Sequence, residues 1–211
     1  MSKKTRKEEN TEKKRPSRKE QLYEEASSGL IYYPRVAAVV IAFALLLFLL
    51  SWADVYNTDI PGKEVSVSGW SFVMSAITGS FTSADGIYGD MAVPFYYYAA
   101  DYCQPLAYVT LAAACAAIAS LAVQVVSIIG KKHGLNYAAV LLSFVSSVLL
   151  IICFCIGLSM SGSDILPIYC SGNPACSIRS FAIIPGVLIL IAGVVNLLAS
   201  LKYFKARKIL K

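Results

Sequence analysis

The chain has 211 residues, of which 57% are hydrophobic and only 15% are charged. A soluble domain typically has about 45–50% apolar and about 25% charged residues. The charges are also segregated, because the first 35 residues hold ten of the 19 Lys and Arg and six of the 13 Asp and Glu. The rest of the chain has too few charges to solvate a globular surface. This composition excludes a soluble enzyme, a coiled coil and a wholly disordered protein.

The N-terminal segment, residues 1–30, mixes Lys, Arg, Glu, Ser, Thr and Asn with little apolar content. Such a stretch cannot bury enough surface to offset its ordering entropy, so we expect a disordered, basic cytoplasmic tail, with a helical stretch near 19–26 as the alternative to full disorder. Its basic residues are expected to attract anionic lipid headgroups. No aromatic or motif framework supports nucleic-acid binding. Membrane lipids are therefore a predicted partner, and nucleic acid is not.

Four apolar runs without Asp, Glu, Lys or Arg follow, each long enough for a helix to cross about 30 Å of hydrocarbon. They are residues 36–53, 105–129, 135–159 and 181–201. The first run exceeds a signal-peptide core and follows a long basic segment, so we expect a retained anchor helix. Only helices satisfy their own backbone hydrogen bonds in lipid. The sequence therefore predicts an all-α transmembrane four-helix bundle over residues 31–204.

The distribution of basic residues predicts the orientation of the spans. Lys and Arg concentrate in the N-terminal segment, in the short loop between the second and third spans at Lys131 and Lys132, and around the predicted C-terminal tail, 205–211. The other two connections, 54–104 and 160–180, hold only Lys63 and Arg179. Positively charged flanks stay on the cytoplasmic side. We expect a multi-pass protein of the plasma membrane with both termini in the cytoplasm.

The first outer loop, 54–104, is predicted to fold into a small acidic cap. Val65 and Val67 alternate with polar residues, which is typical of a short strand. An apolar patch over 70–77 predicts a short helix on the membrane or on the bundle. Asp85 and Asp90 lack the alternating oxygen ligands and final Glu of a calcium loop, so no metal site is predicted. The expected cap surface comprises Trp70, Phe72, Met74, Asp85 and Asp90.

Six cysteines raise the question of disulfides and redox chemistry. Cys170 and Cys176 flank an Asn-Pro turn signal on the predicted oxidising side, so we expect a disulfide between them. Cys103 is free, or it ties the first outer loop to the second instead of that pairing. Membrane thiol oxidoreductases depend on a C-x-x-C motif. This chain has only Cys153-Phe154-Cys155, whose side chains point about 200° apart on a helix.

Two side-chain amides lie well inside the predicted spans. Gln124 and Asn196 are at similar depths, which predicts a hydrogen bond worth about 0.6 kcal/mol and up to about 1.7 kcal/mol. The alternative is a polar relay for an ion, but the spans hold no acid, base or histidine to carry a proton. The lone His133 has no second ligand or catalytic group near it in sequence. We therefore predict no catalysis, no cofactor and no metal.

Trp52 ends the first apolar run, where an aromatic belt residue is expected, and Ser68-Gly69-Trp70 follows in the outer loop. This arrangement is similar to small, uncharacterised bacterial four-span membrane proteins, a likeness that implies topology and no activity. Trp52, Gly69 and Trp70 also resemble the first loop of claudins. The claudin pattern has a Leu between the Gly and the second Trp and two loop cysteines. This chain lacks both features, which excludes that family.

Together these features predict a non-catalytic accessory, assembly or envelope-interaction subunit that acts with a protein partner or as a homo-oligomer. The predicted outer cap is the exposed part, and catalytic motifs are missing from the sequence. A small channel or solute carrier acting as an oligomer is the first alternative. A membrane thiol-redox protein is the second.

Overall fold

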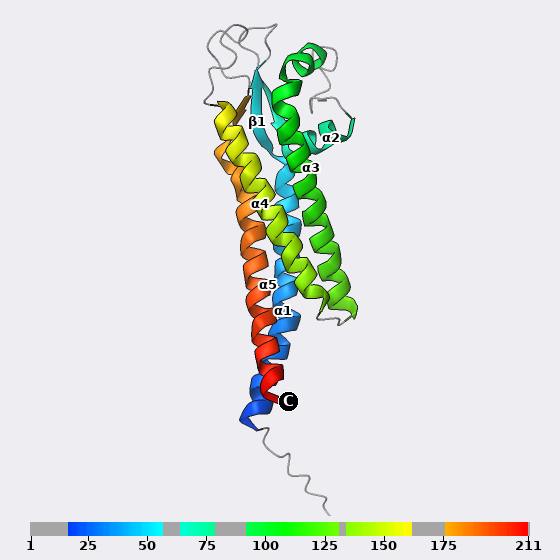
Figure 1. The fold of residues 1–211 in the computed structure, drawn as a ribbon, viewed down its shortest axis with the longest axis vertical. Helices are drawn as coiled ribbons and strands as arrows, with labels where there is room; N and C mark the ends of the chain where they lie inside the picture. The colour runs from blue at the N-terminus through cyan, green and yellow to red at the C-terminus, as the bar shows by residue number, and fades with distance from the viewer. Residues whose placement is uncertain (1–16, 57–63, 79–91, 131–133, 162–175, 211) are drawn as a thin grey trace, which may run out of the picture.

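The computed structural model describes residues 17–56, 64–78, 92–130, 134–161 and 176–210. Four long helices form an elongated bundle, and a small sheet and a short helix cover one end of it (Figure 1). We call this end the cap end. The start of the first helix and the end of the last helix lie together at the opposite end, which we call the terminal end. The long helices are α1 (Arg18–Leu46), α3 (Ala92–Gly130), α4 (Leu135–Ser161) and α5 (Ile184–Leu210).

The predicted fold class is confirmed. Within the described ranges, four helical segments are long and apolar enough to cross a membrane. They are Arg18–Leu49, Pro105–Gly130, Leu135–Ser159 and Ser180–Lys208. The second and third agree closely with the predicted spans. The chain is therefore an integral, multi-pass membrane protein with a four-helix bundle.

The start of α1 contains the helical stretch expected near 19–26 and corrects the disorder predicted for the neighbouring residues up to 30. The helix begins at Arg18, and Ser17 and Glu20 form a capping box. The backbone N–H of Glu20 donates to Ser17 Oγ (3.3 Å), and that of Ser17 donates to Glu20 Oε2 (2.7 Å). These bonds satisfy two donors that a helix start otherwise leaves open. Packing of Ala26 in the bundle further stabilises this first part. Residues 1–16 lie outside the described residues.

The end of the first span also differs from the predicted 36–53. The α-helix ends at Leu46, continues as one 3₁₀ turn, η1 (Leu47–Leu49), and gives way to strand β1 (Ser51–Tyr56). Hydropathy alone cannot detect this change, because Ser51, Trp52 and Ala53 continue the apolar composition of the helix. In the structure Trp52 and Ala53 are buried under the cap.

The cap contains a three-stranded antiparallel sheet with the order β2-β1-β3. The predicted strand is present as β2 (Glu64–Ser68), and the predicted short helix as α2 (Gly69–Thr78). Strand β3 (Cys176–Ile178) comes from the connection between α4 and α5 and was not predicted. It leads through a second 3₁₀ turn, η2 (Ser180–Ile183), into α5. The sheet therefore joins the two connections into one unit.

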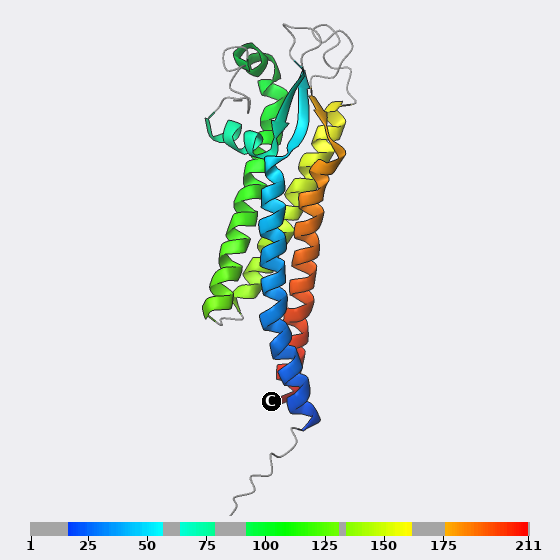
Figure 2. The ribbon, with the colours of Figure 1, turned by 180° about the vertical axis from the view of Figure 1, so that it is seen from behind.

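The helices pack as two antiparallel pairs, α1 with α5 and α3 with α4. At the terminal end, α1 and α5 extend past the end of α3 and the start of α4 (Figures 1 and 2). α5 stays helical to Leu210, through most of the predicted tail at 205–211. The hydroxyls of Tyr23 and Tyr203 lie 3.5 Å apart across the pair, and Phe204 packs on Tyr137 of α4. Contacts between helices thus support α5 beyond its apolar stretch.

Small side chains line the face of α3 that points into the bundle. Ala113, Ala114 and Ala117 are buried. Small residues let helix backbones approach closely, which matters in lipid because burial of apolar surface does not drive helices together there. Gly186 of α5 likewise lies against Leu150 of α4, where an added Cβ would be 3.0 Å from the Leu150 Cβ.

Candidate functional site

The cap meets the bundle at Trp52. A register shift in the β1–β2 ladder falls between Ser51 and Ala53, so this residue lies at an irregular position of β1. Its indole N–H donates to the carbonyl of Leu47 (3.0 Å), and its ring lies 4.4 Å from that of Phe48, centroid to centroid. The side chain is almost completely buried. Trp52 is therefore a packing residue of the cap, and its predicted place in the aromatic belt is wrong.

The Ser68-Gly69-Trp70 motif holds α2 against this tryptophan. A Cβ on Gly69 would lie 2.7 Å from the Trp52 ring, so the close approach requires glycine. Ser68 Oγ accepts from the backbone N–H of Ser71 (3.1 Å) and caps the start of α2. The Trp70 ring lies 5.5 Å from that of Phe48. The motif thus fixes the position of α2 relative to the helices.

Arg179 adds a link that the sequence analysis missed. Its backbone N–H donates to the carbonyl of Trp52 (2.8 Å), and its guanidinium Nη2 donates to Ser66 Oγ (3.3 Å). Arg179 directly follows β3, and Ser66 lies in β2. The side chain therefore links the two edge strands of the sheet across β1. Its sequence signal is weak, because it is a single basic residue in a predicted loop.

The predicted cap surface is correct in part. Met74 is 48% exposed, and its neighbour Ile77 on α2 is 62% exposed. Trp70 is half-buried, whereas Phe72 is only 1% exposed and belongs to the core, so its prediction as a surface residue is wrong. On a helix, Phe72 points away from Met74 because two residues span about 200°. Asp85 and Asp90 lie outside the described residues.

A second polar cluster lies in the bundle core near the terminal end. Asn136 of α4 and Asn196 of α5 exchange two amide hydrogen bonds, with N···O distances of 2.7 and 2.9 Å. The Asn136 amide also donates to Ser200 Oγ (2.7 Å). All three side chains are buried. We call this group the Asn136 cluster, and it joins α4 to α5.

The predicted hydrogen bond between Gln124 and Asn196 is wrong. Asn196 bonds with Asn136 instead, and neither Gln124 Nε2 nor Gln124 Oε1 has a hydrogen-bond partner. The Gln124 side chain is fully buried. The estimate of similar depth did not fix which way each side chain points around its helix. An unpaired amide in a dry core costs about 1–3 kcal/mol, so Gln124 is the least satisfied polar group among the described residues.

Serine hydroxyls make further polar contacts between helices. Ser120 Oγ of α3 donates to the carbonyl of Ala139 in α4 (2.7 Å). Ser146 Oγ of α4 donates to the carbonyl of Ala113 in α3 (2.8 Å), and Ser147 Oγ to that of Gly186 in α5 (2.8 Å). These bonds connect α4 to both neighbours along much of its length.

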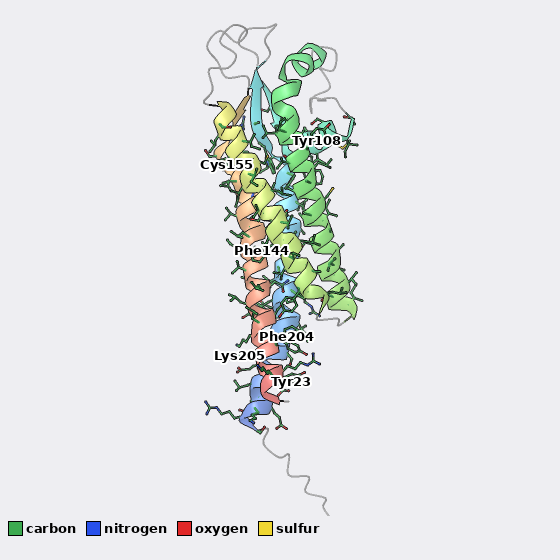
Figure 3. The ribbon with its side chains drawn as sticks, in the orientation of Figure 1. Tyr23, Tyr108, Phe144, Cys155, Phe204 and Lys205 are labelled. Carbon is green, nitrogen blue, oxygen red and sulfur yellow. The ribbon has the colours of Figure 1, made fainter. Side chains whose placement is uncertain are left out.

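The cysteines in the spans are arranged as the helix period requires. Cys153 is buried, with its sulfur 3.2 Å from Thr110 Oγ1, whereas Cys155 is exposed on the outside of α4 (Figure 3). The predicted disulfide cannot be placed, because Cys170 lies outside the described residues and the side chain of Cys176 is not described. Within the described ranges, no three His, Cys, Asp or Glu side chains form a metal-binding group.

Comparison with protein-family models, curated proteins and solved structures found no match to this chain.

Proposed function

We propose that the chain is a non-catalytic accessory subunit of an envelope assembly, with α2 of the cap as the surface that contacts the partner. The observation that carries this proposal is the exposed apolar face of α2, formed by Met74 and Ile77. The proposal includes a plasma-membrane location with both termini cytoplasmic, for which the distribution of basic residues is the support.

The way in which α2 is held favours a docking role. Its first residue, Gly69, lies against the Trp52 ring, and its buried face packs through Phe72 and Val73. The helix therefore presents its exposed side chains in a fixed geometry before any partner binds. Preorganisation lowers the conformational entropy that binding costs.

The use of polar groups inside the bundle supports a structural role. The Asn136 cluster joins α4 to α5, and Ser120 and Ser146 join α3 to α4. These groups make hydrogen bonds between helices, in which their donors and acceptors are already occupied. Such bonds stabilise the packing of helices in lipid.

Site-specific photo-crosslinking in native membranes tests the proposal. A photoreactive residue replaces Ile77 in the full chain, and a matched variant carries it at Val39, an exposed apolar position in the middle of α1. We expect a discrete protein adduct from position 77 and none from position 39. The adduct mass distinguishes a second copy of the chain from another protein. Lipid adducts alone from position 77 would reject the proposal.

A small channel or solute carrier, acting as an oligomer, is the second candidate. Gln124 favours it, because the amide is buried, unpaired and able to offer both a donor and an acceptor. Flux measurements in proteoliposomes test this candidate with Gln124→Leu and, as a control, Ser147→Ala. Flux that Gln124→Leu alone abolishes would favour the channel or carrier. No flux from the unmodified chain would reject it.

A further inference from the structure

The first span contains a shorter charge-free helix than the others. Between Arg35 and the end of η1 at Leu49, eleven α-helical and three 3₁₀ residues rise about 22 Å. The hydrocarbon core of a bilayer is about 30 Å thick. In contrast, the 26 residues of Pro105–Gly130 in α3 rise about 39 Å without a charge. Arg35 therefore falls within the depth that the other helices span without a charge.

The alignment of α1 with α5 and α4 gives the same depth for Arg35 in the bilayer. Tyr23 of α1 lies opposite Tyr203 of α5, and Asn136, the second residue of α4, lies level with Asn196 and Ser200. Arg35 is twelve residues closer to the cap than Tyr23, a rise of about 18 Å. Asn136 is about 7 Å closer to the cap than Tyr203 on the same scale. Arg35 thus lies roughly 10 Å nearer the bilayer centre than the start of α4.

Arg35 is on the outside of the bundle. Its side chain is exposed, and so are those of Tyr32 and Val36, which are 64% and 37% exposed. Figure 2 shows α1 along the front of the bundle between α3 and α5, with no described segment over it. In the described part of the chain, Arg35 makes no hydrogen bond or ion pair. Charged side chains in spans are costly and almost always find an oppositely charged or polar partner.

The outward face of α1 favours a lipid as this partner. Helix–helix contacts in membranes use small residues, but Val39, Phe43 and Leu46 on this face are large and more than half exposed. Tyr32 lies three residues before Arg35 and shares its face, and tyrosine prefers the interface between headgroups and hydrocarbon. The arginine guanidinium matches the geometry of phosphate oxygens and extends toward the headgroups along its apolar stem.

We propose that Arg35 and Tyr32 bind the phosphate of an anionic phospholipid on the outward face of α1. The lipid headgroup is drawn toward the bilayer centre at this point, in the leaflet at the terminal end, and the bilayer is locally thinned along α1. This site is separate from the basic ends of the chain, because Arg35 lies closer to the bilayer centre than those basic residues do. It rests on the depth of Arg35 and is independent of partner binding by α2.

Lipid retention tests the site. The full chain is placed in nanodiscs of phosphatidylcholine and phosphatidylglycerol, and native mass spectrometry measures the phosphatidylglycerol retained after release. We expect retention to fall about fivefold in Arg35→Gln, because this variant loses the two-pronged contact between the guanidinium and the phosphate. Arg35→Lys keeps the charge and loses the two-pronged geometry, so we expect an intermediate loss. The control is Lys202→Gln, an exposed basic residue of α5 near the terminal end, with retention unchanged.

A direct contact measurement completes the test. Dephasing of the arginine guanidinium carbon signal by lipid phosphorus, in solid-state NMR, reports their proximity, and Arg35→Gln assigns the signal. We expect the Arg35 signal to dephase in the unmodified chain. Unchanged retention in Arg35→Gln, equal losses in Arg35→Gln and Lys202→Gln, or no dephasing would each overturn the proposal.

Discussion

The two ends of the bundle are stabilised by different interactions. At the cap end, the shape of Trp52 against Gly69 determines how the sheet and α2 fit on the helices. In the core near the terminal end, the hydrogen bonds of the Asn136 cluster join α4 to α5. The first arrangement tolerates almost no added volume, whereas the second depends on each polar group having a partner. At the cap end, a substitution that adds volume should therefore destabilise more than one that removes a hydrogen-bond partner. At the Asn136 cluster, the order should be reversed.

The largest effect is expected at Gly69. A valine there would put its Cβ within 2.7 Å of the Trp52 ring, and the backbone of α2 or β1 must shift to make room. We expect Gly69→Val to lower the free energy of unfolding by about 3 kcal/mol, the upper range for overpacking. Denaturant titration in mild detergent measures this change. The matched control is Gly134→Ala, where nothing lies within 4 Å of the added Cβ, and a comparable loss in both variants would contradict the packing argument.

A smaller effect is expected from breaking the amide pair. Asn136→Leu leaves the buried Asn196 amide without its partner, and we expect it to lower the free energy of unfolding by about 1–2 kcal/mol. The double variant Asn136→Leu with Asn196→Leu should recover part of this loss, because neither amide is then left unpaired. A double-mutant cycle is expected to give a coupling of about 1 kcal/mol. Additive losses would show that the two side chains do not interact.

The smallest effect is expected at Gln124, and its sign is opposite. Leucine is close in volume to glutamine and has no unpaired polar atoms, so we expect Gln124→Leu to raise the free energy of unfolding by up to about 1 kcal/mol. The same denaturant titration measures it. A clear destabilisation would mean that the amide has a partner in the membrane, such as bound water. It would also strengthen the case for a functional role of Gln124.

The predicted disulfide between Cys170 and Cys176 can be tested without a change in sequence. In peptide mapping of the unreduced chain, Cys170 and Cys176 should not react with an alkylating reagent. Both should be alkylated after reduction, and the mass of their peptide should then increase. Separate alkylation of the two thiols, or a link from either one to Cys103, would contradict the pairing.

The spans were predictable because lipid imposes a length and an absence of charge that hydropathy detects directly. The ends of α1 were predictable only in part, for two local reasons. Its start depends on the capping box at Ser17, inside a segment whose composition predicts disorder. Its end precedes Trp52 and Ala53, which are apolar because the cap buries them and not because lipid does.

The polar contacts between helices were beyond the sequence for a different reason. Residue number gives the depth of a side chain in a straight helix, but not the rotation of that helix against its neighbours. Gln124, Asn136 and Asn196 lie at comparable depths, so only the packing decides which two amides meet. Similarly, the sequence predicts Arg35 as a charge that flanks the first span. Only the start of β1 at Ser51 shows that the helix between Arg35 and the cap is short.

The connection of α1 and α5 through the sheet has a mechanical consequence. α1 continues into β1, α5 is preceded by β3, and these two strands pair with each other. At the other end, Tyr23 and Tyr203 are in contact. The two helices thus form a closed rod, fastened at both tips. Any widening of the bundle should leave that rod intact and swing the α3–α4 hairpin away from it.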